Sequence, residues 1–179
     1  MNNPRLYLSM LVKLPLDDLR HHKNIFQNVY DDKIVGFNKI NGTDFLSNSY
    51  PSVISFEGLL YPTVQHAYEA SKTNDLEIRE LIRKCKTVSG AKKLSRSITV
   101  QKEWVESKVQ IMKNLIREKF QNPFLRHMLL LTNDLKLIHE NNSNDKFWGV
   151  LKNKKEGENW LGKILEEVRE EMKFQENDF

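Results

Sequence analysis

Two stretches of the chain carry side chains that could act on a ligand. Residues 144–149 hold Asp145 and Trp148, a carboxylate and a flat indole three residues apart, followed by Gly149, where a ligand could approach the backbone closely. Residues 61–72 open with a proline typical of the first turn of a helix and carry an amide, an acid and an amine. Together these groups suggest chemistry on a charged sugar.

The spacing within residues 61–72 predicts a reactive edge on one helix. At about 100° per residue, Gln65, Glu69 and Lys72 fall on one narrow stripe beside a more apolar stripe that could pack. A ribosylamine with an exocyclic nitrogen can open to an imine, and a neutral lysine amine can exchange with that nitrogen to form a Schiff base. Lys72 is therefore the candidate nucleophile. The alternative is an ordinary exposed ion pair with Glu69, worth only a few tenths of a kcal/mol.

The roles of the acid and the indole near residue 148 stay open from the sequence. Asp145 could move a proton to the departing base or hold a ribose hydroxyl. Trp148 could stack on the base or cover the sugar. A loop-capping aspartate and a core indole are the alternatives.

Other polar residues could complete such a site. Arg96 could bind a phosphate through its planar guanidinium, or it could be a surface arginine. The turn before the last helix could direct backbone amides at a phosphate, or Asn159 could simply cap that helix. Ser47 and Asn48 offer short hydrogen-bonding groups suited to a ribose or to a turn.

The composition is that of an ordinary globular chain. With 179 residues, 39% hydrophobic and 29% charged, we expect one domain with a real core and no wholesale disorder. The net charge of +4 favours anionic partners only mildly, because the short lysine runs could equally be solvated faces. No run is long enough to span a membrane and no signal peptide is evident, so the sequence predicts a cytoplasmic protein without membrane contact.

Cysteine and histidine usage argues against a disulfide or a metal site. Cys85 is the only cysteine, so no intramolecular disulfide can form and a reducing compartment fits. It falls on the apolar spacing of a helix, which predicts a small core residue rather than a nucleophile. The five histidines lack the spacing that closes a zinc site, and we expect no metal.

The predicted architecture is α+β and predominantly helical, in a single compact domain with a small β element near its N-terminal part. Short apolar pieces at 34–37, 45–46 and 53–56, separated by turn residues, favour small strands. Beyond Pro62 the apolar spacing becomes helical, in particular over 104–120 and 161–172, with another helix starting at Asn122-Pro123. Residues 1–32 carry no motif and are taken as an N-terminal extension that packs on or precedes a domain of residues 33–179.

Several blocks recur in the order and spacing of a known family. They are Phe45-Leu46-Ser47-Asn48-Ser49-Tyr50-Pro51, Tyr61 to Lys72, Ala91-Lys92-Lys93-Leu94-Ser95-Arg96, Trp104 with Lys108 and Met112, Lys119-Phe120-Gln121-Asn122-Pro123, Leu129-Leu130-Leu131-Thr132, Asp145 with Trp148 and Gly149, and Asn159 with Leu161-Gly162. From about Lys33 to Lys173 the chain thus resembles the NADAR family, also called YbiA-like N-glycosidases. Any one block is weak, and their order over most of the chain makes the resemblance specific.

The resemblance implies cleavage of an N-glycosidic bond between a phosphorylated ribose and a nitrogenous base. Two substrate classes are associated with the family: phosphoribosylamino-pyrimidine intermediates of riboflavin synthesis, and ADP-ribose attached to the exocyclic amine of guanine in DNA or RNA. It implies no organic or metal cofactor. It also places His66 and Trp104 among the substrate-binding residues, beside those named above, and leaves the oligomeric state open.

The main departure from the family pattern is Gln65. The family usually has glutamate there, immediately before histidine, and a glutamine cannot shuttle a proton at neutral pH. Either Glu69, one turn away, supplies the carboxylate, or the chain has kept binding and lost catalysis, as a sensor or sponge for an ADP-ribose-like nucleotide. A helical nucleic-acid-binding protein without a sugar site would rest on charge alone and ranks last.

Overall fold

The computed structural model describes residue 26, residues 29–100 and residues 102–177. Two compact units divide the chain: one is formed by the segment 48–121, and the other by the parts of the chain on either side of it. The predominantly helical α+β class predicted from the sequence is confirmed by the described residues. The division at residue 32 stays a prediction, although a short strand, β1 (Val29–Tyr30), precedes that boundary.

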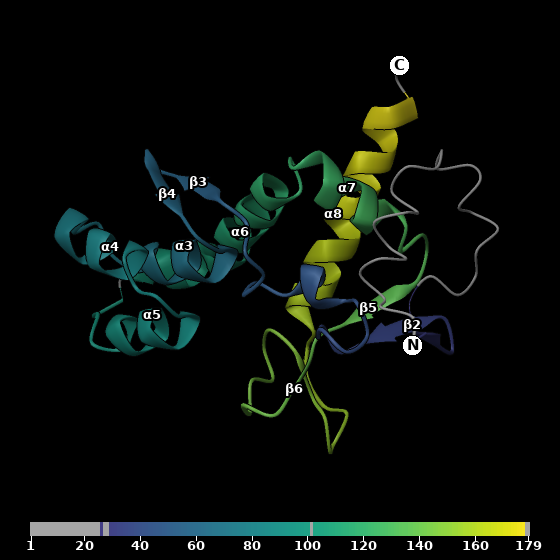
Figure 1. Cartoon of the computed structure of the whole chain (residues 1–179). Coiled ribbons are helices and arrows are strands. Elements are labelled where there is room, and N and C mark those ends of the chain that lie inside the picture. The colour runs from purple at the N-terminus through teal and green to yellow at the C-terminus, as the bar shows by residue number, and fades with distance from the viewer. Residues whose placement is uncertain (1–25, 27–28, 101, 178–179) are drawn as a thin grey trace. The chain divides into compact units, whose positions relative to one another are not determined.

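The unit of residues 48–121 is built around one short buried helix (Figure 1). Its elements are the strands β3 (Ile54–Phe56) and β4 (Leu59–Tyr61) and the helices α3 (Val64–Ala70), α4 (Leu76–Arg83), α5 (Val88–Ser95) and α6 (Lys102–Lys119). Helix α3 contacts all three other helices and both strands. Because every neighbour packs on it, most of α3 is buried and its side chains are held in place by the rest of the unit.

The boundaries of α3 differ from the sequence-based expectation at both ends. The helix starts at Val64, after Thr63, whose hydroxyl accepts a hydrogen bond from the His66 backbone N–H at 3.2 Å. The preceding proline therefore lies before the cap rather than in the first turn. Ser71 is the C-cap, so Lys72 lies in the turn beyond the helix. The expectation of one continuous helical stripe ending at Lys72 was wrong in this respect.

The turn between β3 and β4 confirms the tight turn expected from the turn residues that follow the apolar piece 53–56. Glu57 has φ 45° and Gly58 has φ 80°. Two successive residues with positive φ are characteristic of the tight hairpin turn whose twist matches that of the strands. The strands pair antiparallel, with Ser55 opposite Leu60.

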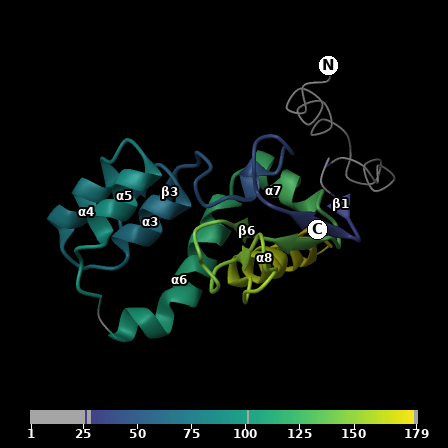
Figure 2. The same cartoon turned by 90° about the horizontal axis from the view of Figure 1, so that it is seen from below.

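The second unit combines short strands with two helices. Its elements are β1, β2 (Lys33–Val35), the short 3-10 helix η1 (Asp44–Leu46), α7 (Pro123–Leu130), β5 (Lys136–Ile138), β6 (Glu140–Asn141), β7 (Val150–Leu151) and α8 (Trp160–Asn177). Strand β2 pairs with β1 and, in parallel, with β5. Helix α8 contacts β5 and α7, and α7 lies alongside α8 in Figures 1 and 2.

Some predicted elements are confirmed and others are wrong. The long helices α6 and α8 follow their apolar spacing, and α7 begins at Pro123 with Asn122 capping the Leu125 N–H at 3.1 Å. The apolar pair at 45–46 forms η1 instead of a strand, and β5, β6 and β7 were not predicted. Cys85 follows α4 and is half-buried rather than a core residue.

Gly162 is the glycine on which the packing of α8 against β5 depends. A Cβ at this position would overlap the Leu137 carbonyl oxygen and the Asn159 side chain. Backbone cannot move aside cheaply, so we expect Gly162→Ala to destabilise the protein by about 2 to 3 kcal/mol. Urea unfolding monitored by circular dichroism would measure the loss. Ala at the exposed neighbour Lys163 is the control, and equal stability of the two variants would contradict the assignment.

No helix in the parts of the chain that the structure describes is long and apolar enough to cross a bilayer.

Candidate active site

The predicted reactive residues of the first stretch meet at one buried carboxylate. Glu69, only 3% exposed, accepts a hydrogen bond from Gln65 Nε2 at 2.6 Å on Oε1. Its other oxygen, Oε2, lies 2.6 Å from Lys72 Nζ and accepts a short hydrogen bond from the Ser95 hydroxyl. The cluster of Gln65, Glu69, Lys72 and Ser95 therefore joins α3, the turn after it and the last residue of α5.

These donors keep the Glu69 carboxylate ionised. Burial acts to raise the pKa of this carboxyl, but hydrogen bonds from Lys72, Ser95 and Gln65 and the charge of Lys72 outweigh it, so the pKa lies below its ordinary value. The sequence left open that Lys72 and Glu69 form only an ordinary exposed ion pair. Glu69 is buried, so the observed ion pair is not of that exposed kind. Glu69 is a fixed negative charge beside an amine and does not act as a proton donor at neutral pH.

Aromatic rings surround the Lys72 amine on its other sides. Its Nζ lies 5.7 Å from the ring centroids of both Tyr68 and Trp104. The two rings are themselves 5.4 Å apart, and the Trp104 indole N–H donates to the Ser71 hydroxyl at 2.9 Å. The side chain of Lys72 is 20% exposed. The amine is thus held in one place by Glu69 and aromatic contacts, and it still reaches solvent.

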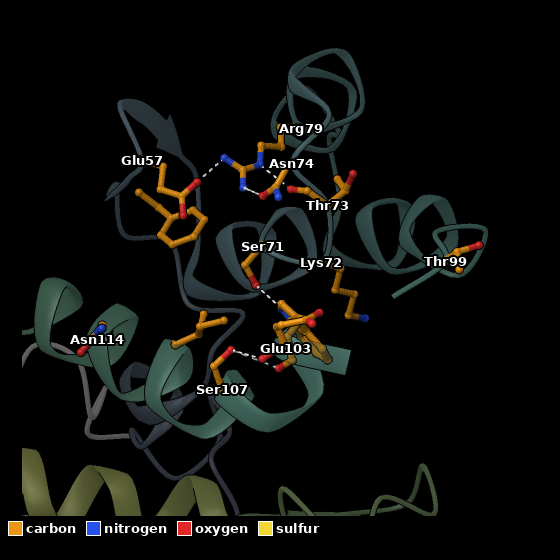
Figure 3. A pocket seen from close by; sticks show the side chains of 13 residues that line it. Glu57, Ser71, Lys72, Thr73, Asn74, Arg79, Thr99, Glu103, Ser107 and Asn114 are labelled. Carbon is orange, nitrogen blue, oxygen red and sulfur yellow. Dashed lines mark hydrogen bonds and ion pairs between the residues drawn. The ribbon is translucent and has the colours of Figure 1, made fainter. Parts of the chain in front are cut away.

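Lys72 lines a pocket of about 380 Å³ in this unit (Figure 3). Its walls come from the β3–β4 turn, the chain just after α3, α4 and one side of α6. Phe56 and Trp104 supply apolar surface, and the remaining wall is largely polar. The volume falls in the range of small-molecule sites in proteins.

One buried arginine ties the pocket walls together. Arg79, with 5% of its side chain exposed, forms a close ion pair with Glu57 of the hairpin turn. It also donates to the Thr73 carbonyl at 2.6 Å and to Asn74 Oδ1 at 3.2 Å. Figure 3 shows these four side chains gathered on one side of the pocket. Arg79 thus fixes the backbone immediately after Lys72.

The structure gives the other predicted residues of this unit different surroundings. Asn48 is buried: its carbonyl accepts from the Gln65 N–H at 2.9 Å, and its Nδ2 lies 3.4 Å from Met112 Sδ. Arg96 is exposed at the C-cap of α5, directly after Ser95. A ribose role for Asn48 and a phosphate role for Arg96 stay predictions.

His66 lies inside the unit, at the first turn of α3. Its Nδ1 is 2.8 Å from the Thr63 hydroxyl, and only 2% of the residue is exposed. Burial lowers the pKa of the His66 imidazole below its ordinary value. Backbone hydrogen bonds with Cys85 and Thr87 and the charge of Glu69 act in the opposite direction but do not outweigh burial. The observed role of His66 is therefore to join α3 to its cap, and substrate contact stays a prediction.

In the other unit, Asp145 stabilises its own loop. Its Oδ1 accepts from the backbone N–H groups of Phe147 at 3.1 Å and Trp148 at 2.9 Å. Asn141 closes the loop from the opposite side, with Nδ2 donating to the Asp145 carbonyl at 2.8 Å. The loop-capping alternative for Asp145 is thus observed, and a chemical role for the same carboxylate stays a prediction.

The glycine and asparagine near Trp148 also serve packing. A Cβ on Gly149 would overlap the His139 carbonyl. The missing side chain at Gly149 therefore makes room for the backbone of His139, where the sequence suggested room for a ligand. Asn159 does not use its side chain to cap α8. It accepts from the His139 N–H and donates to the Leu137 carbonyl, both at 2.9 Å, and so bonds to the chain along β5.

Trp148 and Ser47 are both half-buried. The Trp148 indole packs edge-on against Phe147, with ring centroids 5.0 Å apart. The Ser47 backbone N–H donates to the Asp44 carbonyl at 3.0 Å at the end of η1. The core-indole alternative for Trp148 is only partly met, because the ring keeps some exposure.

The NADAR domain family matches residues 25–173 of the chain. The chain belongs to the NADAR family.

Among the residues that the structure describes, no group of three or more His, Cys, Asp or Glu side chains could hold a metal ion.

Relatives of this NADAR chain include proteins with assigned activities. It is 36% identical over 151 residues to a protein of Escherichia coli named N-glycosidase YbiA, covering 82% of this chain and 92% of that one. It is 34% identical over 152 residues to a riboflavin biosynthesis protein of Vibrio vulnificus, covering 83% of this chain but only 41% of that protein's length. The solved NMR structure of Escherichia coli YbiA matches with a TM-score of 0.74 and 30% identity, over 93% of this chain and 97% of that one. These similarities support a glycosidase enzyme with the YbiA fold.

Ser95 and Arg79 were not among the predicted site residues of this NADAR chain. Ser95 reaches Glu69 across 26 residues of sequence, and Arg79 reaches Glu57 across 22. The position of Ser95 within one of the family-like blocks was the available signal. Nothing in the helical spacing of Arg79 indicated that its guanidinium would be buried.

The buried ion pair predicts a pH-dependent stability. The pKa of Glu69 is lowered from its ordinary value of 4.5, so its contribution is complete above about pH 4.5 and is lost as the pH falls through the lowered folded value. We expect the wild type to be more stable than Glu69→Gln at neutral pH, and the difference to shrink in acid. Urea unfolding from neutral pH to about pH 3 measures it. Glu106→Gln, an exposed position on α6, is the control; a pH-independent difference for Glu69→Gln would contradict the assignment.

Proposed function

We propose that the protein is an N-glycosidase that hydrolyses the bond between a phosphorylated ribose, or ADP-ribose, and an amino nitrogen of a base. The observation that carries the proposal is the Lys72 amine, held 2.6 Å from the buried Glu69 carboxylate in the wall of a pocket. The names of the relatives as N-glycosidase and riboflavin biosynthesis protein support the same chemistry.

The proposed reaction passes through a Schiff base on Lys72. The ribosylamine ring opens to an imine, the Lys72 ammonium gives a proton to the imine nitrogen, and the resulting amine adds to the imine carbon. The carbon–nitrogen bond to the base then breaks, the base leaves as a free amine, and Lys72 remains joined to the sugar as an imine. Water adds to this imine and releases the sugar aldehyde and the lysine amine. The net change is hydrolysis of one carbon–nitrogen bond, without a cofactor.

Glu69 has a defined part in this scheme. The protonated imine carries a positive charge where the lysine ammonium was, and the adjacent carboxylate stabilises it. Gln65 donates to that carboxylate and so helps to hold it. In this assignment Glu69 supplies the carboxylate that the family usually has at position 65, and Gln65 positions it.

The amide at position 65 also favours a second candidate. Because Gln65 cannot transfer a proton, a protein that binds the ligand and leaves it intact is the alternative. The ligand would stabilise such a binder against unfolding, and the more so the further its concentration exceeds the dissociation constant, as for any ligand that binds only the folded state.

The two candidates separate in one experiment. A guanine-ADP-ribosylated oligonucleotide and a phosphoribosylamino-pyrimidine are incubated with the wild type, with Lys72→Ala and with Lys86→Ala, a control at an exposed lysine. Mass spectrometry measures release of the base and the sugar. Release by wild type and Lys86→Ala alone supports the glycosidase. Intact ligand together with a raised unfolding temperature supports the binder. If neither release of the base nor a raised unfolding temperature is observed, both candidates are ruled out.

A further inference from the structure

The charges that line the pocket are almost completely paired. Four charged side chains contribute to its wall: Glu57, Lys72, Arg79 and Glu103. Lys72 is held by Glu69 and Arg79 by Glu57. Both cations are therefore already neutralised by carboxylates, and the pocket offers no uncompensated positive charge to a phosphate.

Glu103 is different from the other three. It is exposed at the first turn of α6, and no ion pair to it is found among residues 29–100 and 102–177. Its neighbour one turn on, Glu106, is paired with Lys102 at 3.5 Å instead. Figure 3 shows Glu103 and Ser107 on the same helix in the pocket wall, where the Ser107 hydroxyl donates to the Glu103 backbone carbonyl at 2.7 Å. The one unpaired charge of the wall is thus an acceptor of hydrogen bonds.

We propose that this pocket takes the nitrogen heterocycle of the substrate, and that Glu103 accepts hydrogen bonds from an amino group and an adjacent ring N–H on its edge. A carboxylate pairs well with two such parallel donors. Guanine and aminopyrimidinones share this edge. In the phosphoribosylamino-pyrimidine the ribose is attached to another nitrogen, so this edge stays free to pair with Glu103. In ADP-ribosylated guanine the amino nitrogen itself carries the ribose, so the pairing favours the pyrimidine as the occupant. The flat surfaces of Phe56 and Trp104 suit the ring faces. The inference rests on the proposed function for the identity of the ligand, and it places the base, rather than the phosphate, in this pocket.

The test is discrimination between two nucleosides that differ only in the amino group. Isothermal titration of the full chain with guanosine, and with inosine, which lacks that group, measures the dissociation constants. A carboxylate that accepts from the amino group should make guanosine bind at least about tenfold more tightly than inosine. Glu103→Gln should bring the ratio close to one, because an amide presents one acceptor oxygen and an N–H₂ donor, which cannot pair with two parallel N–H donors. Glu106→Gln, on the same helix and outside the pocket lining, should keep the wild-type ratio.

The outcomes separate this inference from the proposed function. Equal affinities for the two nucleosides, absence of guanosine binding, or an unchanged ratio in Glu103→Gln would overturn the base assignment, even if base release from the substrates is observed. A ratio that depends on Glu103, with no base release from either substrate, would support the pocket and contradict the glycosidase. Circular dichroism of both variants establishes that each is folded before its ratio is interpreted.

Discussion

Lys72→Arg is expected to lose base release by roughly 10³-fold or more, and to lose all covalent trapping by borohydride. Arginine retains a positive charge and can pair with Glu69, so the cluster that holds this side chain is largely preserved. A guanidinium stays protonated and cannot form a Schiff base. The variant therefore removes the nucleophile while keeping the ion pair, which Lys72→Ala does not.

The measurement is single-turnover release on an accepted substrate, with and without borohydride, followed by mass spectrometry of the protein. Wild type should gain the mass of the reduced sugar at Lys72, and Lys86→Ala should behave as wild type. Unchanged unfolding temperature in Lys72→Arg would establish that the loss is chemical. An active Lys72→Arg, or an adduct that persists without Lys72, would exclude the Schiff-base assignment.

Asp145→Ala is expected to abolish turnover with the fold retained. The structure adds a second consequence, because this change also removes the acceptor for the backbone N–H groups of Phe147 and Trp148. Asp145→Asn separates the two effects: the amide oxygen can still accept those bonds, but it cannot carry a proton or a charge. If the carboxylate takes part in proton transfer, Asp145→Asn should lose about 10² to 10⁴-fold in turnover.

Turnover and unfolding temperature of both Asp145 variants decide between the roles. Low activity of Asp145→Asn at wild-type stability would support a chemical role for the carboxylate. Full activity of Asp145→Asn beside a weakened Asp145→Ala would mean that Asp145 serves only its loop. Asn142→Ala, at an exposed residue of the same loop, is the matched control for effects of substitution in this loop.

A structural feature could be predicted from the sequence when the residues that it joins are close together along the chain. The pairing of Glu69 with Lys72 could be expected, because residues three apart near a helix are neighbours whatever the rest of the fold does. The strands β5 to β7 could not, because two or three residues carry no recognisable alternation and β5 pairs with the distant β2. The start of α3 depended on the Thr63 cap, which competes with the preceding proline as a start signal.

Local sequence was sufficient for the helical class, for the family, and for the contact between Lys72 and Glu69, because periodicity, capping and short spacings act between near neighbours. Only the tertiary structure buried Glu69 beside Ser95, tied Arg79 to Glu57, and used the side chain of Asn159 along β5. These contacts join residues twenty or more positions apart, so they arise only when packed elements bring separate segments of the chain within hydrogen-bonding distance.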